Sequence, residues 1–178
     1  IVETSLFTQG TTSFSSIIFF DSDGIQGTRG RDELAYEMGR QWFYGLIGTD
    51  QINAPWLGEG ASAMLSQYVF HSESDVEKIM NNNYNILKQS VYSNVVLSDN
   101  LDKYSTWEQY LAQKKKAALM FYNLKEKVGN DKFYEIIKKY SVAYSYKIAT
   151  GENFCRIAEE VSGINLRQFF DEWISGQT

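Results

Sequence analysis

Helical periodicity, which runs from about Gly30 to the end of the chain, constrains the fold more than any other feature of the sequence. A first series of apolar residues recurs at every fourth position: Leu34, Met38, Trp42 and Leu46. This spacing predicts a helix that buries one face. Further helices are predicted over 56–70, from Ser74, over 106–128, over 131–144, over 151–162 and from Asn165.

Capping residues set the ends of several of these helices. Ser72 or Ser74 lies beside acidic residues and predicts an N-cap, and Thr150 predicts another. Gly129 and Gly163 follow helical series and predict C-terminal stops. Starts and stops of this kind are typical of a mainly α fold.

The first 20 residues are expected to be extended. The apolar run SIIFF at 16–20 is followed by the turn signal DSDG, and we predict two short strands around a turn at Gly10. The expected fold class is therefore mainly α (α+β), with a single domain over 1–178. Within it, 1–28 would form a strand and loop edge and 29–178 a helical part. Because the sequence lacks an initiator methionine, we expect it to be a piece of a longer protein.

Charge and composition argue against several classes of function. A net charge of −5 and a pI of about 5.0 argue against a nucleic-acid partner, which normally meets a basic surface. No apolar run approaches the roughly 18 residues of a membrane span. Cys155 is the only cysteine, so the chain can form neither an internal disulfide nor a thiolate metal cluster. The sequence gives no cellular location.

Residues 36–40, Tyr-Glu-Met-Gly-Arg, have the spacing of a helical zinc site. In the motif His-Glu-x-x-His, histidines at i and i+4 share a helix face and bind one ion, and the glutamate acts as general base. Here Tyr36 and Arg40 stand at the histidine positions, and Glu37 stands at the position of the base. Eighteen residues separate Arg40 from Glu59, which a second helix could return to the first as a further ligand.

The surrounding residues resemble the gluzincin aminopeptidases, the alanyl- and leucyl-type zinc enzymes. Bacterial members read roughly His-Glu-x-x-His-Gln-Trp-Phe-Tyr-Gly and then Trp-Leu-Asp/Asn-Glu-Gly. The matching residues are Glu37, Gln41, Trp42, Phe43, Tyr44, Gly45, Trp56, Leu57, Glu59 and Gly60. Later segments such as KVGNDKFYEIIKKY and EEVSGINLRQFFDEW are also similar to that family, so the resemblance spans nearly the whole chain. It implies a helical, thermolysin-like metallopeptidase subdomain with a short N-terminal strand element.

The positions that differ from the family pattern are those of its metal ligands and catalytic residues. Tyr36 and Arg40 replace the two histidine ligands. The family's Gly-x-Met-Glu strand, whose glutamate holds the substrate amine, aligns with GTTSF, which places Ser13 at the glutamate. The family's oxyanion-stabilising tyrosine aligns with Lys114, with Tyr110 one turn earlier as the runner-up. The resemblance therefore implies a dismantled active site, in which Glu37 is the vestigial general base.

Tyr36 and Arg40 are poor ligands for a zinc ion. A guanidinium about 4 Å from a dication costs about 8 kcal/mol at an effective dielectric of 20. We expect instead that Arg40 pairs with both Glu37 and Glu59 in a partly buried site, and that Tyr36 donates to Glu59. The alternative is that Glu37 and Arg40 form an exposed pair of little energetic weight. We therefore predict no cofactor, and zinc only if the site works with non-standard ligands.

Other residues that could carry chemistry have simpler interpretations. His71, the only histidine, is expected at the surface or a helix end, far from Glu59. Cys155 is expected to be a small buried apolar residue. Six aromatic residues at helical spacings are expected in the core: Trp42, Phe43, Trp56, Phe169, Phe170 and Trp173.

Three functions are compatible with this pattern. The first is a catalytically inactive zinc-aminopeptidase-like domain with a peptide-binding or protein-interaction role. The second is an active zinc-dependent peptidase with non-standard ligands, which Glu37, Glu59 and the resemblance favour. The third is a purely structural interaction module. We favour the first, because the changes fall on the ligands, the amine anchor and the oxyanion donor together.

Overall fold

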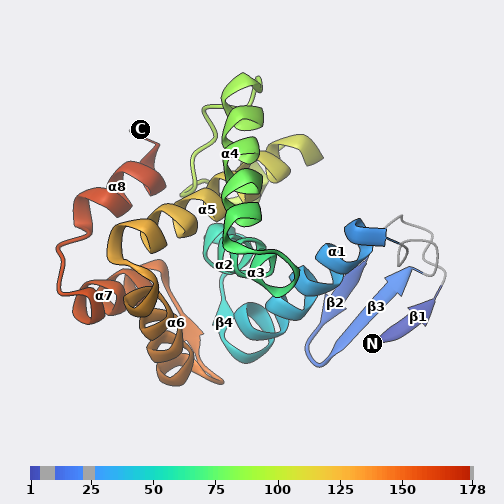
Figure 1. Cartoon of the computed structure of the whole chain (residues 1–178), viewed down its shortest axis with the longest axis horizontal. Helices are drawn as coiled ribbons and strands as arrows, with labels where there is room; N and C mark the ends of the chain where they lie inside the picture. Colours follow the sequence, from blue (N-terminus) through green and yellow to red (C-terminus); the bar gives the residue numbers. More distant parts are fainter. Residues whose placement is uncertain (5–10, 22–26, 177–178) are drawn as a thin grey trace.

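The computed structural model describes residues 1–4, 11–21 and 27–176, and it is mainly helical (Figure 1). Its α-helices are α1 (Gly27–Arg40), α2 (Pro55–Leu65), α3 (Gln67–Phe70), α4 (Glu73–Gln89), α5 (Trp107–Val128), α6 (Asn130–Tyr144), α7 (Gly151–Ser162) and α8 (Arg167–Ser175). A π-helical turn, η1 (Gln41–Leu46), continues α1, and a 3-10 turn, η2 (Leu101–Lys103), precedes α5. The strands are β1 (Val2–Thr4), β2 (Thr12–Phe14), β3 (Ile17–Asp21), β4 (Gly48–Thr49) and β5 (Ile148–Ala149). The predicted fold class is confirmed.

Several predicted helix ends are confirmed by their caps. The side chain of Ser72 accepts a hydrogen bond from the backbone of Asp75 and caps α4. Thr150 forms a capping box with Asn153 at the start of α7, and Gly163 ends that helix in the left-handed conformation, with φ of +73°. Local sequence signals therefore set these boundaries.

The helix predicted over 56–70 is divided into α2 and α3 at Ser66. The Ser66 hydroxyl donates to the carbonyl of Ala63 at 3.2 Å, a contact that competes with the regular helical ladder. The last helix also begins at Arg167 rather than Asn165. The Asn165 side chain accepts a hydrogen bond from the Arg167 backbone at 3.1 Å, so it lies just outside the helix.

The N-terminal strands differ from the predicted pair around Gly10, a residue that lies outside the described part. The sheet has the order β1-β3-β2, with β1 parallel and β2 antiparallel to the central strand β3. Strands β2 and β3 are joined by a turn at Ser15 and Ser16, where Ser16 has φ of +67°. Neither residue is glycine or proline, so the strongest local turn signals are absent from this segment of the sequence.

The core lies around α5, which crosses the middle of the molecule and packs closely on α2 (Figure 1). Gly60 permits this approach, since a Cβ there would lie 2.7 Å from the Cβ of Ala117. Of the six aromatic residues expected in the core, Phe43, Trp56 and Phe170 are buried, whereas Phe169 and Trp173 are half-buried. The sixth, Trp42, is exposed.

The prediction that Met38 and Trp42 lie on the buried face of the first helix is wrong. Met38 and Trp42 are 47% and 54% exposed. The helix instead turns its small residues towards α2: Ala35 is buried, and a Cβ on Gly39 would lie 3.3 Å from the Cα of Ser62. Close backbone packing therefore buries the face with the small residues, and this buried face continues to Phe43 in η1. The larger apolar side chains, Met38 and Trp42, remain exposed to solvent.

A short parallel pair, β4 with β5, joins the end of η1 to the segment after α6. Gly48 donates to the carbonyl of Lys147 at 2.8 Å, and a Cβ at Gly48 would lie 3.2 Å from that oxygen. This link fixes the end of η1 beside the segment that follows α6. Among the helices of the described residues, none has the length and apolar character needed to cross a membrane.

Candidate functional site

Two buried carboxylates meet where α1 packs against α2. Glu37 comes from α1 and Glu59 from α2, and both are almost fully buried. A buried carboxylate is costly unless it is paired or hydrogen-bonded. The neighbours of these two side chains therefore decide what the site can do.

Arg40 forms ion pairs with both carboxylates. Its Nη1 lies 3.5 Å from Oε2 of Glu37, and its Nε lies 3.7 Å from Oε1 of Glu59. The two carboxylate side chains are only 4% and 6% exposed, whereas the arginine side chain is 22% exposed. Both predicted ion pairs are present, and the alternative of an exposed pair is wrong. Burial opposes the charge on Arg40, but Glu59 and its other neighbours offset it, so the pKa of the guanidinium is raised.

Two tyrosines donate hydrogen bonds to Glu59. The hydroxyl of Tyr36 donates to Oε2, as predicted, and that of Tyr44 donates to Oε1 at 2.9 Å. Burial, reinforced by the charge of Glu59, raises the pKa of both phenols, so both remain protonated donors. Both oxygens of this carboxylate are therefore occupied by neutral donors, in addition to the Arg40 ion pair.

Tyr44 was missed as a site residue by the sequence analysis. Gly58 makes room for it, because a Cβ at that position would lie 2.6 Å from Cζ of Tyr44. The sequence did contain a signal, since Gly58 stands where the resembling family has Asp or Asn.

Ser13 lies on β2 and donates a hydrogen bond to Oε2 of Glu37. The strand is held against η1 by Gln41, whose side chain accepts from the backbone of Ser16 at 2.8 Å and donates to the carbonyl of Phe14 at 3.2 Å. The structure thus brings Ser13 to the cluster, with its hydroxyl directed at the carboxylate of the neighbouring helix.

Lys114 and Tyr110 both approach the cluster from α5. The Nζ atom of Lys114 lies 3.1 Å from the ring centroid of Tyr36, a cation–π contact. Burial lowers the pKa of Lys114 to about 8, although Glu59 and Glu37 act in the opposite direction. Tyr110 is half-buried, and burial together with the charge of Glu59 raises its pKa. Both candidates for the oxyanion-donor position therefore lie near Glu59.

The Lys114→Met variant is expected to lose a pH dependence of stability. Because the native pKa is about 8 and the ordinary value is 10.5, the unfolded chain binds more protons between these values. Stability should therefore rise with pH from about 8 to about 10, by at most about 3 kcal/mol. Urea unfolding near pH 7 and near pH 10 measures this rise, with Lys115→Met as the control. An equal rise in both variants would contradict the assignment to Lys114.

The remaining candidate residues lie outside this cluster. His71 ends α3, and its Nε2 lies 2.9 Å from Oδ1 of Asp32, in agreement with the predicted helix-end position. Cys155 is half-buried on α7, and burial raises the pKa of its thiol to about 12, which disfavours a nucleophilic thiolate. Neither residue contributes to the site between α1 and α2.

A cavity of about 450 Å³ opens beside the cluster. Arg40, Tyr44 and Glu59 form one wall, and the wall contributed by α5 and the segment before it is largely aromatic. The aromatic residues on that side are Tyr104, Trp107 and Tyr110. The size and the mixture of apolar and polar walls are typical of a site for a small ligand or a short peptide segment.

A sequence model described as the Peptidase family M1 domain matches residues 11–173. The chain belongs to the M1 peptidase family. This finding confirms the resemblance to zinc aminopeptidases that the sequence suggested. No match was found among curated protein sequences.

Solved M1 structures share the fold. An M1 zinc metallopeptidase from Deinococcus radiodurans has a TM-score of 0.78 at 19% identity, over 99% of this chain and 39% of that one. A mutant of the same enzyme, bound to the substrate Tyr-Ser-Ala, has a TM-score of 0.78 at 16% identity with the same coverage. Native yeast LTA4 hydrolase has a TM-score of 0.73 at 16% identity, over 94% of this chain and 30% of that one. The chain thus spans about two fifths or less of these relatives.

The residues between α1 and α2 do not fit the zinc ion that the M1 family implies. Catalytic zinc normally takes three deprotonated protein ligands. Here the pKa of the Tyr36 phenol is raised, and the Arg40 guanidinium lies within 4 Å of both carboxylates. Within the described residues, no group of three or more His, Cys, Asp and Glu side chains could hold a metal ion. The Arg40 guanidinium already supplies a positive charge between these carboxylates.

Proposed function

We propose that this chain is a catalytically inactive M1 peptidase-like domain with a peptide-binding or protein-interaction role. The observation that carries the proposal is the double ion pair of Arg40 with Glu37 and Glu59. A permanent guanidinium charge replaces a divalent ion, but it has no vacant orbital for a water or a carbonyl oxygen. Glu37 therefore has no metal-bound water to activate.

The residues that would orient a peptide for cleavage are also altered. Ser13 stands at the position of the amine-binding glutamate, and its hydroxyl is directed at Glu37. A hydroxyl in that contact offers no negative charge to a free α-amine. Lys114 stands at the position of the oxyanion donor and contacts the Tyr36 ring. In this proposal, Tyr36, Arg40, Glu59, Ser13 and Lys114 are the altered positions of a former active site.

The cavity beside Arg40 supports a retained binding role. Its walls combine aromatic rings with polar groups, and such walls bind peptide side chains and carbonyl groups together. The mutant Deinococcus relative is bound to a tripeptide, Tyr-Ser-Ala. We therefore propose a short peptide segment as the ligand class, bound without hydrolysis.

Zinc analysis and peptide binding test the proposal together. Protein purified without chelator should contain far less than about one zinc per chain, and Tyr-Ser-Ala should remain intact. The same peptide should slow amide exchange over residues 36–60. Trp107→Ala, in the cavity wall, should weaken this protection, whereas Tyr84→Ala, on the exposed face of α4, should not.

Two results would replace the proposal by its alternatives. About one tightly bound zinc per chain, with peptide hydrolysis, would establish an active enzyme with non-standard ligands. That alternative is favoured by the side-by-side placement of Glu37 and Glu59. The absence of both zinc and peptide protection would leave a structural interaction module.

A further inference from the structure

The cavity beside Arg40 offers a ligand a positive charge. Arg40, Tyr44 and Glu59 form one of its walls, and its volume is about 450 Å³. The arginine side chain is 22% exposed, whereas the side chain of Glu59 is 6% exposed. Both oxygens of Glu59 already accept hydrogen bonds from the hydroxyls of Tyr36 and Tyr44. A ligand in the cavity therefore meets the guanidinium more readily than the carboxylate.

The guanidinium of Arg40 is also short of hydrogen-bond acceptors. Its two ion pairs span 3.5 Å and 3.7 Å, which is longer than the roughly 3.2 Å that a normal N–H···O hydrogen bond allows. Its buried Nε atom has no hydrogen-bond partner among the described residues. A guanidinium has five N–H donors in a planar fork that matches the two oxygens of a carboxylate. The cluster therefore leaves donor capacity for an acceptor group on a ligand.

The surroundings of the cavity favour an anionic group. Pro55 is the first residue of α2 and Trp107 the first residue of α5, and both line the cavity. The start of a helix carries a partial positive charge. Lys114 is largely protonated near neutral pH because its pKa is about 8, so Arg40 and Lys114 together balance the two buried carboxylates. The cluster as a whole therefore does not repel an anion.

The same cavity has an aromatic wall. Tyr104, Trp107 and Tyr110 contribute to it, and the ring centroids of Trp107 and Tyr110 are 4.7 Å apart. Trp107 is 66% exposed, so its ring can contact a ligand. Such rings bind aromatic and apolar side chains. The cavity thus combines a cation that fits a carboxylate with a surface that fits a side chain, and the C-terminal residue of a peptide carries these two groups on one Cα atom.

We propose that the cavity binds the C-terminal residue of a peptide, with its free carboxylate at Arg40 and an aromatic side chain against Trp107 and Tyr110. This inference rests on the proposed function, because it names the part of a peptide that the inactive site recognises. Ser13 offers no negative charge to a free amine. The recognised end of the peptide would therefore be opposite to the end that the zinc aminopeptidases bind.

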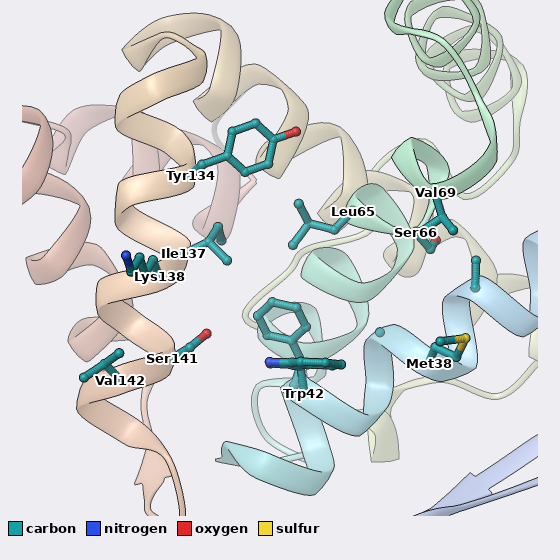
Figure 2. Close-up of a pocket in the computed structure, with 13 residues that line it drawn as sticks. Met38, Trp42, Leu65, Ser66, Val69, Tyr134, Ile137, Lys138, Ser141 and Val142 are labelled. Atoms are coloured by element: carbon teal, nitrogen blue, oxygen red, sulfur yellow. The ribbon is translucent and has the colours of Figure 1, made fainter.

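A second cavity lacks this combination and provides a control. It has a volume of about 510 Å³ and is bounded by α1 with η1, by the α2–α3 junction and by α6 (Figure 2). Among its lining residues Lys138 is the only charged one, and this lysine is exposed on α6. An exposed ammonium group is strongly hydrated and lacks the planar fork of an arginine. A peptide carboxylate should therefore not prefer Lys138.

Peptides that differ only at their ends test the proposal on the full-length natural protein. Isothermal titration calorimetry should show that N-acetyl-Ala-Ala-Phe binds about tenfold more tightly as the free acid than as the C-terminal amide. Removing the acetyl group from the free acid should change the affinity by less than about twofold. Equal affinity of acid and amide, or binding of neither, would overturn the proposal.

Two other outcomes identify a different error. If the amide of N-acetyl-Ala-Ala-Asp binds as tightly as the free acid of the phenylalanine peptide, the cavity recognises any carboxylate, and the C-terminal assignment is overturned. If the protein contains zinc and hydrolyses Ala-Ala-Phe, the proposed loss of catalysis is wrong. If the peptides stay intact and bind without regard to their C-terminal group, the inactive peptide-binding domain stands and only this inference fails.

Matched variants locate the carboxylate contact. Arg40→Met combined with Glu59→Gln removes one charge of each sign, and this double variant should bind the acid and the amide equally. Lys138→Met, in the second cavity, should keep the tenfold preference. Retention of the preference in the double variant, or its loss in Lys138→Met, would place the carboxylate elsewhere and overturn the proposal.

The aromatic contact is tested at an exposed position, where a substitution should leave the fold intact. Trp107→Ala should weaken binding of the phenylalanine peptide about fivefold and leave the preference for the free acid unchanged. The same variant should change the affinity of N-acetyl-Ala-Ala-Ala by less than about twofold. An equal loss for both peptides would show that the ring does not contact the last side chain, and that part of the proposal would be overturned.

Discussion

Replacing Arg40 by methionine is expected to destabilise the fold by about 3 kcal/mol, because it leaves two buried carboxylates without their cation. Glu37 and Glu59 are held in place by α1 and α2, and neither can turn to solvent without disturbing the packing of these helices. The hydrogen bonds from Ser13, Tyr36 and Tyr44 would remain, but neutral donors do not cancel two like charges. Urea unfolding at neutral pH measures the loss.

Two further variants separate charge from packing in this prediction. The double variant Arg40→Met with Glu59→Gln removes one charge of each sign and should recover more than about half of the lost stability. Lys132→Met, which breaks an exposed pair with Glu135, should cost less than about 1 kcal/mol. If Arg40→Met costs no more than Lys132→Met, the guanidinium is not the counter-charge of the cluster.

The contacts of Arg40 could be predicted from the sequence because helix geometry fixes them. Glu37 and Arg40 are three residues apart on one helix, so their side chains must lie on neighbouring positions of its surface. Glu59 could be predicted as the second partner only from the family resemblance. Local periodicity does not show that the helix with Glu59 packs against the helix with Arg40. The capped ends at Ser72, Thr150 and Gly163 were predictable for the same local reason.

Features that depend on tertiary packing could not be predicted in this way. The four-residue spacing of Met38 and Trp42 indicated a helix correctly, but it did not show which face would be buried. Gly39 decided that question, because close contact with Ser62 turns the small-residue face inwards. Tyr44 was missed for a related reason, since the space it fills exists only because Gly58 has no side chain.

These errors have a common physical origin. Apolar periodicity reports where large side chains are, whereas close helix packing is set by where side chains are absent. The exposure of Met38 and Trp42 follows from the same cause, since the helix packs on α2 through Ala35 and Gly39.

Restoring both histidines should restore zinc binding. In Tyr36→His with Arg40→His, two imidazoles would share one face of α1, and Glu59 would supply the third ligand from α2. The guanidinium that lies within 4 Å of both carboxylates would be absent, and Tyr44 would still orient Glu59 through its hydrogen bond of 2.9 Å. We expect about one zinc per chain, and a gain of about 2.7 kcal/mol in the free energy of unfolding at a zinc concentration of 100 times Kd.

Two further variants make this prediction specific to the proposed site. Tyr36→His alone keeps the guanidinium beside the carboxylates and should bind no zinc, since the charge that opposes the metal remains. Adding Glu59→Gln to the double histidine variant should remove most of the affinity, because the third ligand loses its charge. If the double variant folds but binds no zinc, then Glu59 and its tyrosine neighbours do not preserve the geometry of a metal site. In that case the ion pairs of Arg40 would belong to a rebuilt core, and the altered positions could not be interpreted as those of a former active site.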